Sequence, residues 1–345
     1  MRGVYALLRL NAVLRGHRSK FVAAYLAHTC GLRHLAIRFD PVMACNLRCR
    51  MCYFSNDEWV RRAKVKGGAF SASELERLAA MFFPKSLLVV FGCGTEPTLY
   101  RDYPELVRLA KRHRVPNVSL TTNAQLLDAD AVERLIDYHL DELTVSVHGT
   151  VRDTYERFMT GASFDRLHRS LTILEDAKRR RRVQVPALRI NYTVNEENLD
   201  ELGRFFDEFG GYSVSILQVR PVMDFNGAYR RMLAGSHLER YRRTISALGE
   251  QCARRGITYL ANTVDPAYQA QNDRGVILQA VQRNISPVRV WREDFDWRAE
   301  TYDEFCRRIG WSAHLLRCAT APLDRVVHQR VGLTETYSAR YDVNL

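Results

Sequence analysis

The chain has few of the features that mark secreted, membrane-spanning or disordered proteins. Only eight of its 345 residues are cysteines, which excludes a disulfide-dense scaffold, and no eighteen successive residues are apolar, which excludes a membrane-spanning helix. Acidic residues number 39 against 51 basic ones, for a formal net charge of +12. With 46% apolar residues, the sequence predicts a globular protein with one large domain and a smaller additional region.

Three of the eight cysteines lie within eight residues. Cys45, Cys49 and Cys52 form a C-x3-C-x2-C run directly after the apolar segment 35–40. Thiolates bind both zinc and iron–sulfur clusters, but a closed structural zinc site needs four ligands, and no other cysteine has a finger-like spacing to these three. Three thiolates on a four-iron cluster leave one iron open. Because oxidation would destroy such ligands, we expect a reducing, cytoplasmic location.

A glycine-rich motif follows the next apolar run, residues 87–90. The motif contains Gly92, Gly94 and Glu96 in the order Gly-x-Gly-x-Glu-Pro. Glycines let the backbone approach a ligand closely, and a carboxylate suits a charge-assisted hydrogen bond to an ammonium group. Taken alone, the motif would indicate no more than a turn with a surface glutamate.

In this order, the two motifs resemble those of the radical S-adenosylmethionine (radical SAM) enzymes, over residues 35–225. The resemblance implies that the three cysteines hold a 4Fe–4S cluster, that the open iron takes the amino and carboxylate groups of S-adenosylmethionine, and that Glu96 hydrogen-bonds the amino group. It also implies reductive cleavage of the cofactor to a 5′-deoxyadenosyl radical, which abstracts hydrogen from substrate. A reductant such as flavodoxin or ferredoxin would supply the electron.

The resemblance also implies further cofactor contacts. Met51 and Tyr53 flank the third cysteine, and Met51 stands where the family usually has an aromatic residue near the adenine. Asn123 either lines the cofactor pocket or caps a turn, and Ser146 either contacts the ribose or carboxylate or faces the core.

Two other polar residues at strand ends, His148 and Arg220, are candidate substrate contacts. A single histidine or arginine in such a place is more often a hydrogen-bonded rim residue, and that alternative stays open. Cys93, inside the glycine-rich motif, is either a pocket thiol or a small packing residue, and we favour packing.

Short strands alternate with helices of ten or more residues along the first two thirds of the chain. This alternation predicts right-handed crossovers and a parallel sheet, and six such units predict an α/β fold with a partial (β/α)6 TIM-like barrel. Eight-unit closure is excluded by count. We expect strands at 35–40, 86–91, 117–123, 142–148, 188–194 and 212–222, and helices at 73–83, 102–114, 128–139, 164–181 and 199–209. Ligands bind beyond the carboxyl ends of such strands, where the cysteine loop, Glu96, Asn123, His148 and Arg220 would converge.

We divide the chain into three regions: an N-terminal basic amphipathic helical extension (1–34), the core barrel (35–225) and a smaller C-terminal α+β capping region (226–345). The last region contains a long helix at 237–255 and, up to residue 298, a stretch that reads as irregular apart from a short strand.

The C-terminal region also resembles, in part, the opening of a SPASM or Twitch extension, around Cys318. No cysteine follows Cys318, so the match is incomplete. Either Cys252, Cys306 and Cys318 hold an auxiliary iron–sulfur cluster, or they are ordinary buried cysteines of a truncated extension, which we favour.

The expected substrate is a peptide or a small metabolite. A nucleic-acid partner, and with it RNA modification, is supported only by net charge, and the densest basic run, 178–182, falls at a helix C-terminus, where cations suit the helix dipole. The stretch 1–32 either packs across the barrel end or makes peripheral contact with acidic lipids. A non-catalytic zinc-stabilised binding module is the alternative from another functional class.

Overall fold

The structure is a computed structural model that describes residues 16–66, 68–222, 233–261 and 276–328. Its strands are β1 (Leu35–Phe39), β2 (Ser86–Phe91), β3 (Asn117–Thr122), β4 (Glu142–Val147), β5 (Ala187–Val194), β6 (Val214–Pro221), β7 (Thr258–Ala261), β8 (Gln282–Ser286) and β9 (Arg289–Val290). Its helices are α2 (His17–Thr29), α3 (Asp57–Lys66), α4 (Ala72–Phe82), α5 (Tyr103–Arg112), α6 (Ala129–Asp137), α7 (Arg152–Phe158), α8 (Phe164–Arg181), α9 (Leu199–Leu202), α10 (Phe205–Phe209), α11 (Ser236–Arg254), α12 (Leu278–Val281), α13 (Tyr302–Arg308), α14 (Trp311–Thr320) and α15 (Leu323–Val327). Short 3-10 turns lie at Tyr53–Ser55, Phe83–Lys85 and Pro97–Leu99.

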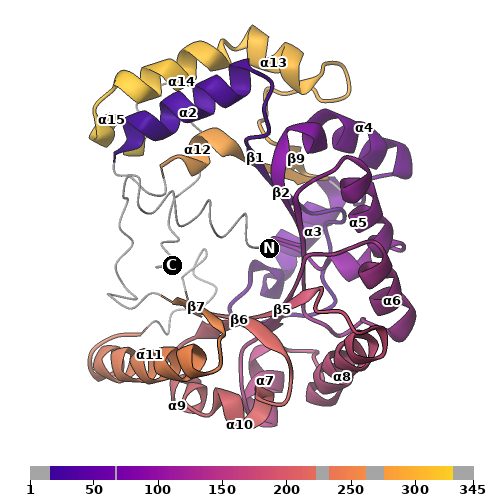
Figure 1. Ribbon diagram of the computed structural model, residues 1–345, viewed down its shortest axis with the longest axis vertical. Helices are drawn as coiled ribbons and strands as arrows, with labels where there is room; N and C mark the ends of the chain where they lie inside the picture. Colours follow the sequence, from indigo (N-terminus) through magenta and orange to yellow (C-terminus); the bar gives the residue numbers. More distant parts are fainter. Residues whose placement is uncertain (1–15, 67, 223–232, 262–275, 329–345) are drawn as a thin grey trace.

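The strands form one curved sheet in the order β7-β6-β5-β4-β3-β2-β1-β8-β9 (Figure 1). Every neighbouring pair is parallel except β8 with β9. Helices α4, α5, α6 and α8 cover the outer side of the sheet. The α/β fold with a partial TIM-like barrel is therefore confirmed.

Two parallel strands extend the six predicted units. Strand β7 pairs with β6, while β8, from the stretch read as irregular, pairs with β1. The sequence did not reveal β8 because its residues, Gln-Arg-Asn-Ile-Ser, are mostly polar. Both strands come from beyond residue 225, so this region adds to the core sheet, and the division into three regions stays a prediction.

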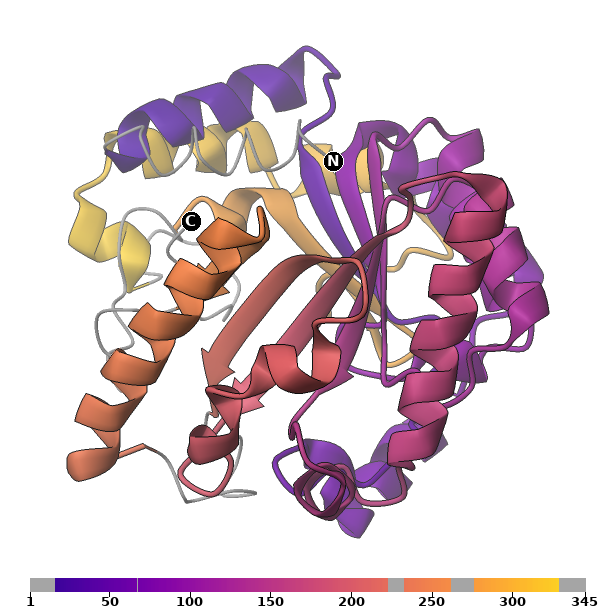
Figure 2. The ribbon, with the colours of Figure 1, turned by 60° about the horizontal axis from the view of Figure 1, so that its bottom comes forward.

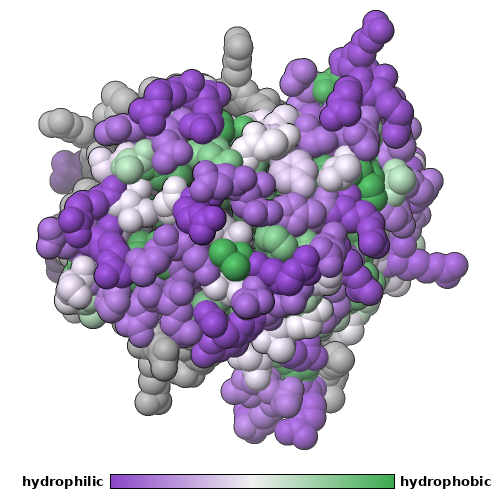
Figure 3. All heavy atoms as spheres, turned by 90° about the horizontal axis from the view of Figure 1, so that it is seen from below, coloured by the Kyte–Doolittle hydropathy of each residue, from purple (hydrophilic) through white to green (hydrophobic). Residues whose placement is uncertain are grey.

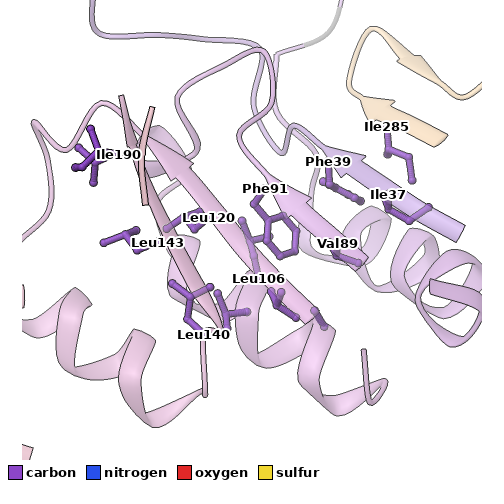
Figure 4. Close-up of a cluster of buried hydrophobic side chains, with 14 of the residues drawn as sticks. Ile37, Phe39, Val89, Phe91, Leu106, Leu120, Leu140, Leu143, Ile190 and Ile285 are labelled. Carbon is purple, nitrogen blue, oxygen red and sulfur yellow. The ribbon is translucent and has the colours of Figure 1, made fainter. Parts of the chain in front are cut away.

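The face of the sheet that meets the helices is apolar. Side chains from six different strands point to it, and each is at most 1% exposed: Ile37, Phe39, Val89, Phe91, Leu120, Leu143, Ile190 and Ile285 (Figure 4). Leu106 of α5 packs against them from the helical layer. Because successive strand residues point to opposite faces, this alternation fixes which residues face the concave side.

The concave face is polar across β3 to β6. The alternate residues there are Ser119, Thr121, Glu142, Thr144, Ser146, Arg189, Asn191, Gln218 and Arg220. A parallel sheet covered on both faces would be apolar on both, so the polar face marks the side on which this partial barrel receives polar groups.

Helix α2 lies alongside α14, as both ribbon views show (Figures 1 and 2). Phe21 of α2 is buried, and the His17 imidazole hydrogen-bonds the Ala321 carbonyl at 2.8 Å. The described part of the N-terminal extension therefore packs against the protein, whereas residues 1–15 lie outside the described residues.

The basic run at the end of α8 forms ion pairs with α6. Arg180 pairs with Glu133 at 2.5 Å, and Arg181 pairs with Asp137 at 2.6 Å. Such exposed ion pairs contribute little to the free energy of unfolding. They do neutralise part of the positive charge that would attract a nucleic acid. The face shown in Figure 3 is mainly hydrophilic, with apolar residues scattered singly. In the described part of the chain, no helix has the length and apolar character needed to span a bilayer.

We expect Leu143→Ala to lower the free energy of unfolding by about 3 kcal/mol, because it leaves a cavity between sheet and helices. Leu126→Ala is the control, since Leu126 is 40% exposed and the chemical change is the same. Urea unfolding should place the control within about 0.5 kcal/mol of the wild type. Equal losses in the two variants would contradict the packing described.

Candidate active site

The loop that carries the three cysteines follows β1 and is held by backbone hydrogen bonds. The Arg48 and Arg50 amides donate to the carbonyls of Thr160 and Phe158, each at 2.9 Å. The guanidinium of Arg50 also lies over the Phe158 ring at 5.2 Å. The end of α7 and the residues after it therefore support the cysteine loop from one side.

The three thiols influence one another electrostatically. Burial raises the pKa of Cys45 to about 11, with smaller upward contributions from Glu96 and Cys52. Burial also raises the pKa of Cys49, and the other two thiols add to that shift. Within the described ranges, no group of three or more His, Cys, Asp or Glu side chains is arranged to hold a single metal ion. Three neighbouring cysteines can, however, supply three of the four ligands of a 4Fe–4S cluster.

Glu96 is 2% exposed, and its carboxylate is held by four hydrogen bonds. Its Oε1 accepts from Thr98 N at 3.2 Å, Thr98 Oγ1 at 2.6 Å and Thr122 Oγ1 at 2.7 Å. Its Oε2 accepts from Asn123 N at 2.8 Å. Burial raises the pKa of Glu96, while these donors act in the opposite direction. Because three of the four bonds fall on Oε1, Oε2 is the oxygen with room for a further cationic donor.

Both glycines of the motif have close neighbours. Gly92 has φ = 78°, and a Cβ there would lie 2.3 Å from the Thr121 carbonyl oxygen. A Cβ on Gly94 would lie 2.7 Å from the Tyr53 hydroxyl, which donates a hydrogen bond to the Gly94 carbonyl. Tyr53 therefore links the third cysteine to the glycine-rich loop, and its predicted contact with a cofactor stays a prediction.

The ends of the first three strands meet. Asn123, after β3, donates through Nδ2 to the Oδ1 of Asn46 at 2.8 Å, and Asn46 directly follows Cys45. The Glu96 amide donates to the Ala44 carbonyl at 2.9 Å. The structure thus brings the cysteine loop, Glu96 and Asn123 to one rim of the sheet.

His148, at the end of β4, accepts a hydrogen bond at Nδ1 from Thr193 N at 3.2 Å. An accepting Nδ1 carries no proton, and removal from water lowers the pKa of His148 to about 4. The residue is therefore a neutral imidazole that joins β4 to β5. Ser146 is half-buried on the concave face, paired in register with Asn191.

A polar network spans the concave face beside these residues. Arg189 donates to Asn191 and to Glu142, each at 3.2 Å, and also to Gln218. Arg220 donates to the same Gln218 oxygen at 2.9 Å. Arg220 is thus part of a hydrogen-bonded layer, and its contact with a substrate stays a prediction.

Met51 is 8% exposed and packs with Phe158 and Val222. Its proposed place near an adenine therefore stays a prediction. Burial raises the pKa of Cys93, and its Sγ lies 3.5 Å from the Val90 carbonyl oxygen, in line with the packing alternative.

The three remaining C-terminal cysteines do not come together. Cys252 lies on α11, on the opposite side of the molecule from α13 and α14, which carry Cys306 and Cys318 (Figures 1 and 2). All three are buried, and Cys318 contacts His314 at 3.5 Å. This arrangement does not support one auxiliary cluster shared by the three.

Sequence reasoning missed Asp40, the residue directly after β1. Its Oδ1 accepts from Cys93 N at 2.8 Å, Gly94 N at 3.0 Å and Thr95 Oγ1 at 2.9 Å. The available signal was a carboxylate at a strand end, just before the cysteine loop. Thr98, Thr122 and Asn46, which hold Glu96 and Asn123, were also missed.

Residues 41–209 match the family model of the radical SAM superfamily. The chain is 28% identical over 189 residues to a probable GTP 3′,8-cyclase of Saccharolobus solfataricus, covering 54% of this chain and 57% of that protein. A probable GTP 3′,8-cyclase of Metallosphaera sedula is 28% identical over 190 residues, covering 54% and 56%. The matches thus span little more than half the length of these relatives.

Solved structures share the fold. Streptococcus suis SuiB bound to S-adenosylmethionine matches with a TM-score of 0.57 at 16% identity, over 76% of this chain and 60% of SuiB. The protein anSMEcpe, with bound S-adenosylmethionine and a peptide, matches with a TM-score of 0.52 at 18% identity, over 65% and 63%. At these identities the likeness concerns the fold.

The low pKa of His148 predicts an acid-sensitive fold. Between pH 6.5 and about 4, the unfolded chain binds a proton at His148 that the folded protein does not, so the free energy of unfolding falls as the pH falls. His148→Gln should make that decline smaller in urea unfolding series. Some decline remains, because burial also lowers the pKa of His34 to about 4. The exposed His328→Gln is the control, and an equal effect in both variants would contradict the assignment.

Proposed function

We propose that this chain, whose residues 41–209 match the radical SAM superfamily, reductively cleaves S-adenosylmethionine and abstracts hydrogen from a substrate. Membership implies that its cofactors are a 4Fe–4S cluster and S-adenosylmethionine. The observation that carries the proposal is that hydrogen bonds from Glu96 and Asn123 to Ala44 and Asn46 bring the buried carboxylate of Glu96 to the loop of the three cysteines.

Cys45, Cys49 and Cys52 are the proposed cluster ligands. A cluster held by these thiolates would supply the single electron that reductive cleavage of a sulfonium requires. The raised thiol pKa values mean that ligation must displace protons, which the metal charge favours. We also propose a low-potential protein reductant, such as flavodoxin or ferredoxin.

Glu96 is the proposed acceptor for the methionine ammonium, through Oε2. The bond would be charge-assisted, and the bonds to Oε1 from Thr98 and Thr122 fix the carboxylate plane before the ligand arrives. Gly94 is a proposed cofactor neighbour through its backbone, since the Tyr53 hydroxyl takes the space where a Cβ would lie. Together these residues bind and orient the cofactor and keep water from it.

The concave face is the proposed substrate side. Arg189, Arg220 and Glu142 form a charged, hydrogen-bonded layer there, which favours a polar substrate. Both a small polar metabolite and a peptide fit this chemistry. The curated relatives are named for a nucleotide substrate, and SuiB has been solved with its precursor peptide SuiA.

We expect Cys49→Ala to lose the cluster, because two thiolates cannot replace the third ligand. Anaerobic reconstitution with iron and sulfide should give about four of each per wild-type chain and far fewer in the variant. Cys252→Ala is the control, since Cys252 is buried on α11, away from the loop. Zinc binding without iron, in a colourless wild-type protein, would instead support the binding-module alternative.

We expect Glu96→Gln to weaken S-adenosylmethionine binding by about tenfold or more, because the charge that the ammonium meets is lost while the amide oxygen still accepts hydrogen bonds. Iron content should stay at the wild-type level. Calorimetric titration of the reconstituted protein measures the affinity, and Glu105→Gln, on the outer helix α5, is the control. Wild-type affinity in Glu96→Gln would remove its assigned contact.

A further inference from the structure

We propose that Asp40 is a positioning residue for the cofactor, which holds segment 92–96 in the shape that presents Gly94 and Glu96 to S-adenosylmethionine. This inference rests on the proposed function and adds a residue that lies outside both sequence motifs. Asp40 is the first residue after β1, five positions before Cys45.

A single oxygen of Asp40 gathers three donors from the glycine-rich loop. Oδ1 accepts the amides of Cys93 and Gly94 and the hydroxyl of Thr95, at 2.8, 3.0 and 2.9 Å. Because two successive amides donate to one oxygen, the orientations of the two peptide planes that contain these amides are fixed. Without the carboxylate these amides would lose their partner and the loop would relax.

Backbone hydrogen bonds hold both ends of segment 92–96, and Asp40 holds its middle. Gly92 N donates to the Phe39 carbonyl at 3.0 Å, and Glu96 N donates to the Ala44 carbonyl at 2.9 Å. Asp40 itself is anchored, because its amide donates to the Ile285 carbonyl of β8 at 2.8 Å. The chain after β1 therefore holds the chain after β2 at both ends of segment 92–96, through the carbonyls of Phe39 and Ala44.

Gly94 lies in a narrow gap between Asp40 and Tyr53. A Cβ on Gly94 would lie 3.3 Å from the Asp40 Oδ2 and 2.7 Å from the Tyr53 hydroxyl. Tyr53 in turn donates to the Gly94 carbonyl, and it directly follows Cys52. Asp40 thus sets the distance between the glycine-rich loop and the third cluster ligand, the two parts that one cofactor molecule must bridge.

The test compares Asp40→Ala with Asp40→Asn, which keeps an accepting Oδ1 without the charge. In reconstituted protein, Asp40→Ala should hold the wild-type amount of iron and bind S-adenosylmethionine about tenfold more weakly. Adding the cofactor should also change the electron paramagnetic resonance signal of the reduced cluster less than it does in the wild type. Asp40→Asn should recover affinity to within about threefold. In the cluster-free protein, amide hydrogen exchange at 92–96 should be faster in Asp40→Ala.

Asp141→Ala is the matched control. The Asp141 carboxylate accepts a backbone amide, Val118 N, at 2.7 Å, before the start of β4 and away from the cysteine loop. Its loss costs a similar local interaction, yet cofactor affinity should stay at the wild-type value. Thr95→Val removes one donor to Asp40 and should weaken cofactor binding by about threefold. It tests the same hydrogen-bonded contact if Asp40→Ala fails to fold.

Two outcomes would overturn the inference while leaving the proposed function intact: wild-type cofactor affinity in both Asp40→Ala and Thr95→Val, or equal losses in Asp40→Ala and Asp141→Ala. Failure of the wild type itself to bind S-adenosylmethionine would overturn the proposed function and this inference with it.

Discussion

A buried carboxylate organises the rim of this protein. Taking the Glu96 carboxylate out of water is costly, and the cost is offset only if donors surround it. Those donors come from its own turn, through Thr98, and from the end of β3, through Thr122 and Asn123. The ends of β2 and β3 are therefore fixed relative to each other. The cysteine loop joins them through Asn46, so hydrogen bonds connect the cysteine loop, Glu96 and Asn123 in one unit.

Because side chains alternate along each strand, the residues that stabilise the sheet and the polar residues of the concave face lie on opposite sides of it. Apolar side chains on the outer face pack under the helices and hold the sheet, while the opposite face carries hydroxyl, amide and charged groups. Because the two sets interleave along the same strands, polar groups reach the interior of the half-barrel without interrupting the apolar core. The polar network around Arg189 and Glu142 then keeps charged groups compensated where water is scarce.

The local features of the site could be predicted from the sequence because short spacings encode them. The cysteine run and the glycine-rich turn depend on neighbours a few residues away. The six-unit fold was recognisable because apolar strands alternate with amphipathic helices. The sequence also named Glu96, although not the threonines that hold it.

What could not be predicted depends on contacts between distant residues. Strand β8 was missed because one of its two buried outward residues is an arginine. Arg283 is fully buried, its guanidinium lies 4.0 Å from the Trp291 ring, and its Nη2 donates to the Tyr302 hydroxyl. No periodicity reveals a cation that is stabilised by aromatic rings. Asp40 was missed for a related reason, since its three donors lie more than fifty residues along the chain.

The pairing of β1 with β8 has a consequence for biosynthesis. Strand β1 is synthesised long before its second neighbour, which ends at Ser286, so one edge of β1 stays open until β8 has been made. An open edge is a template for pairing with other chains. The nascent protein therefore carries its thiol loop next to an unprotected strand until β8 arrives, and a chain terminated before β8 would keep that edge exposed.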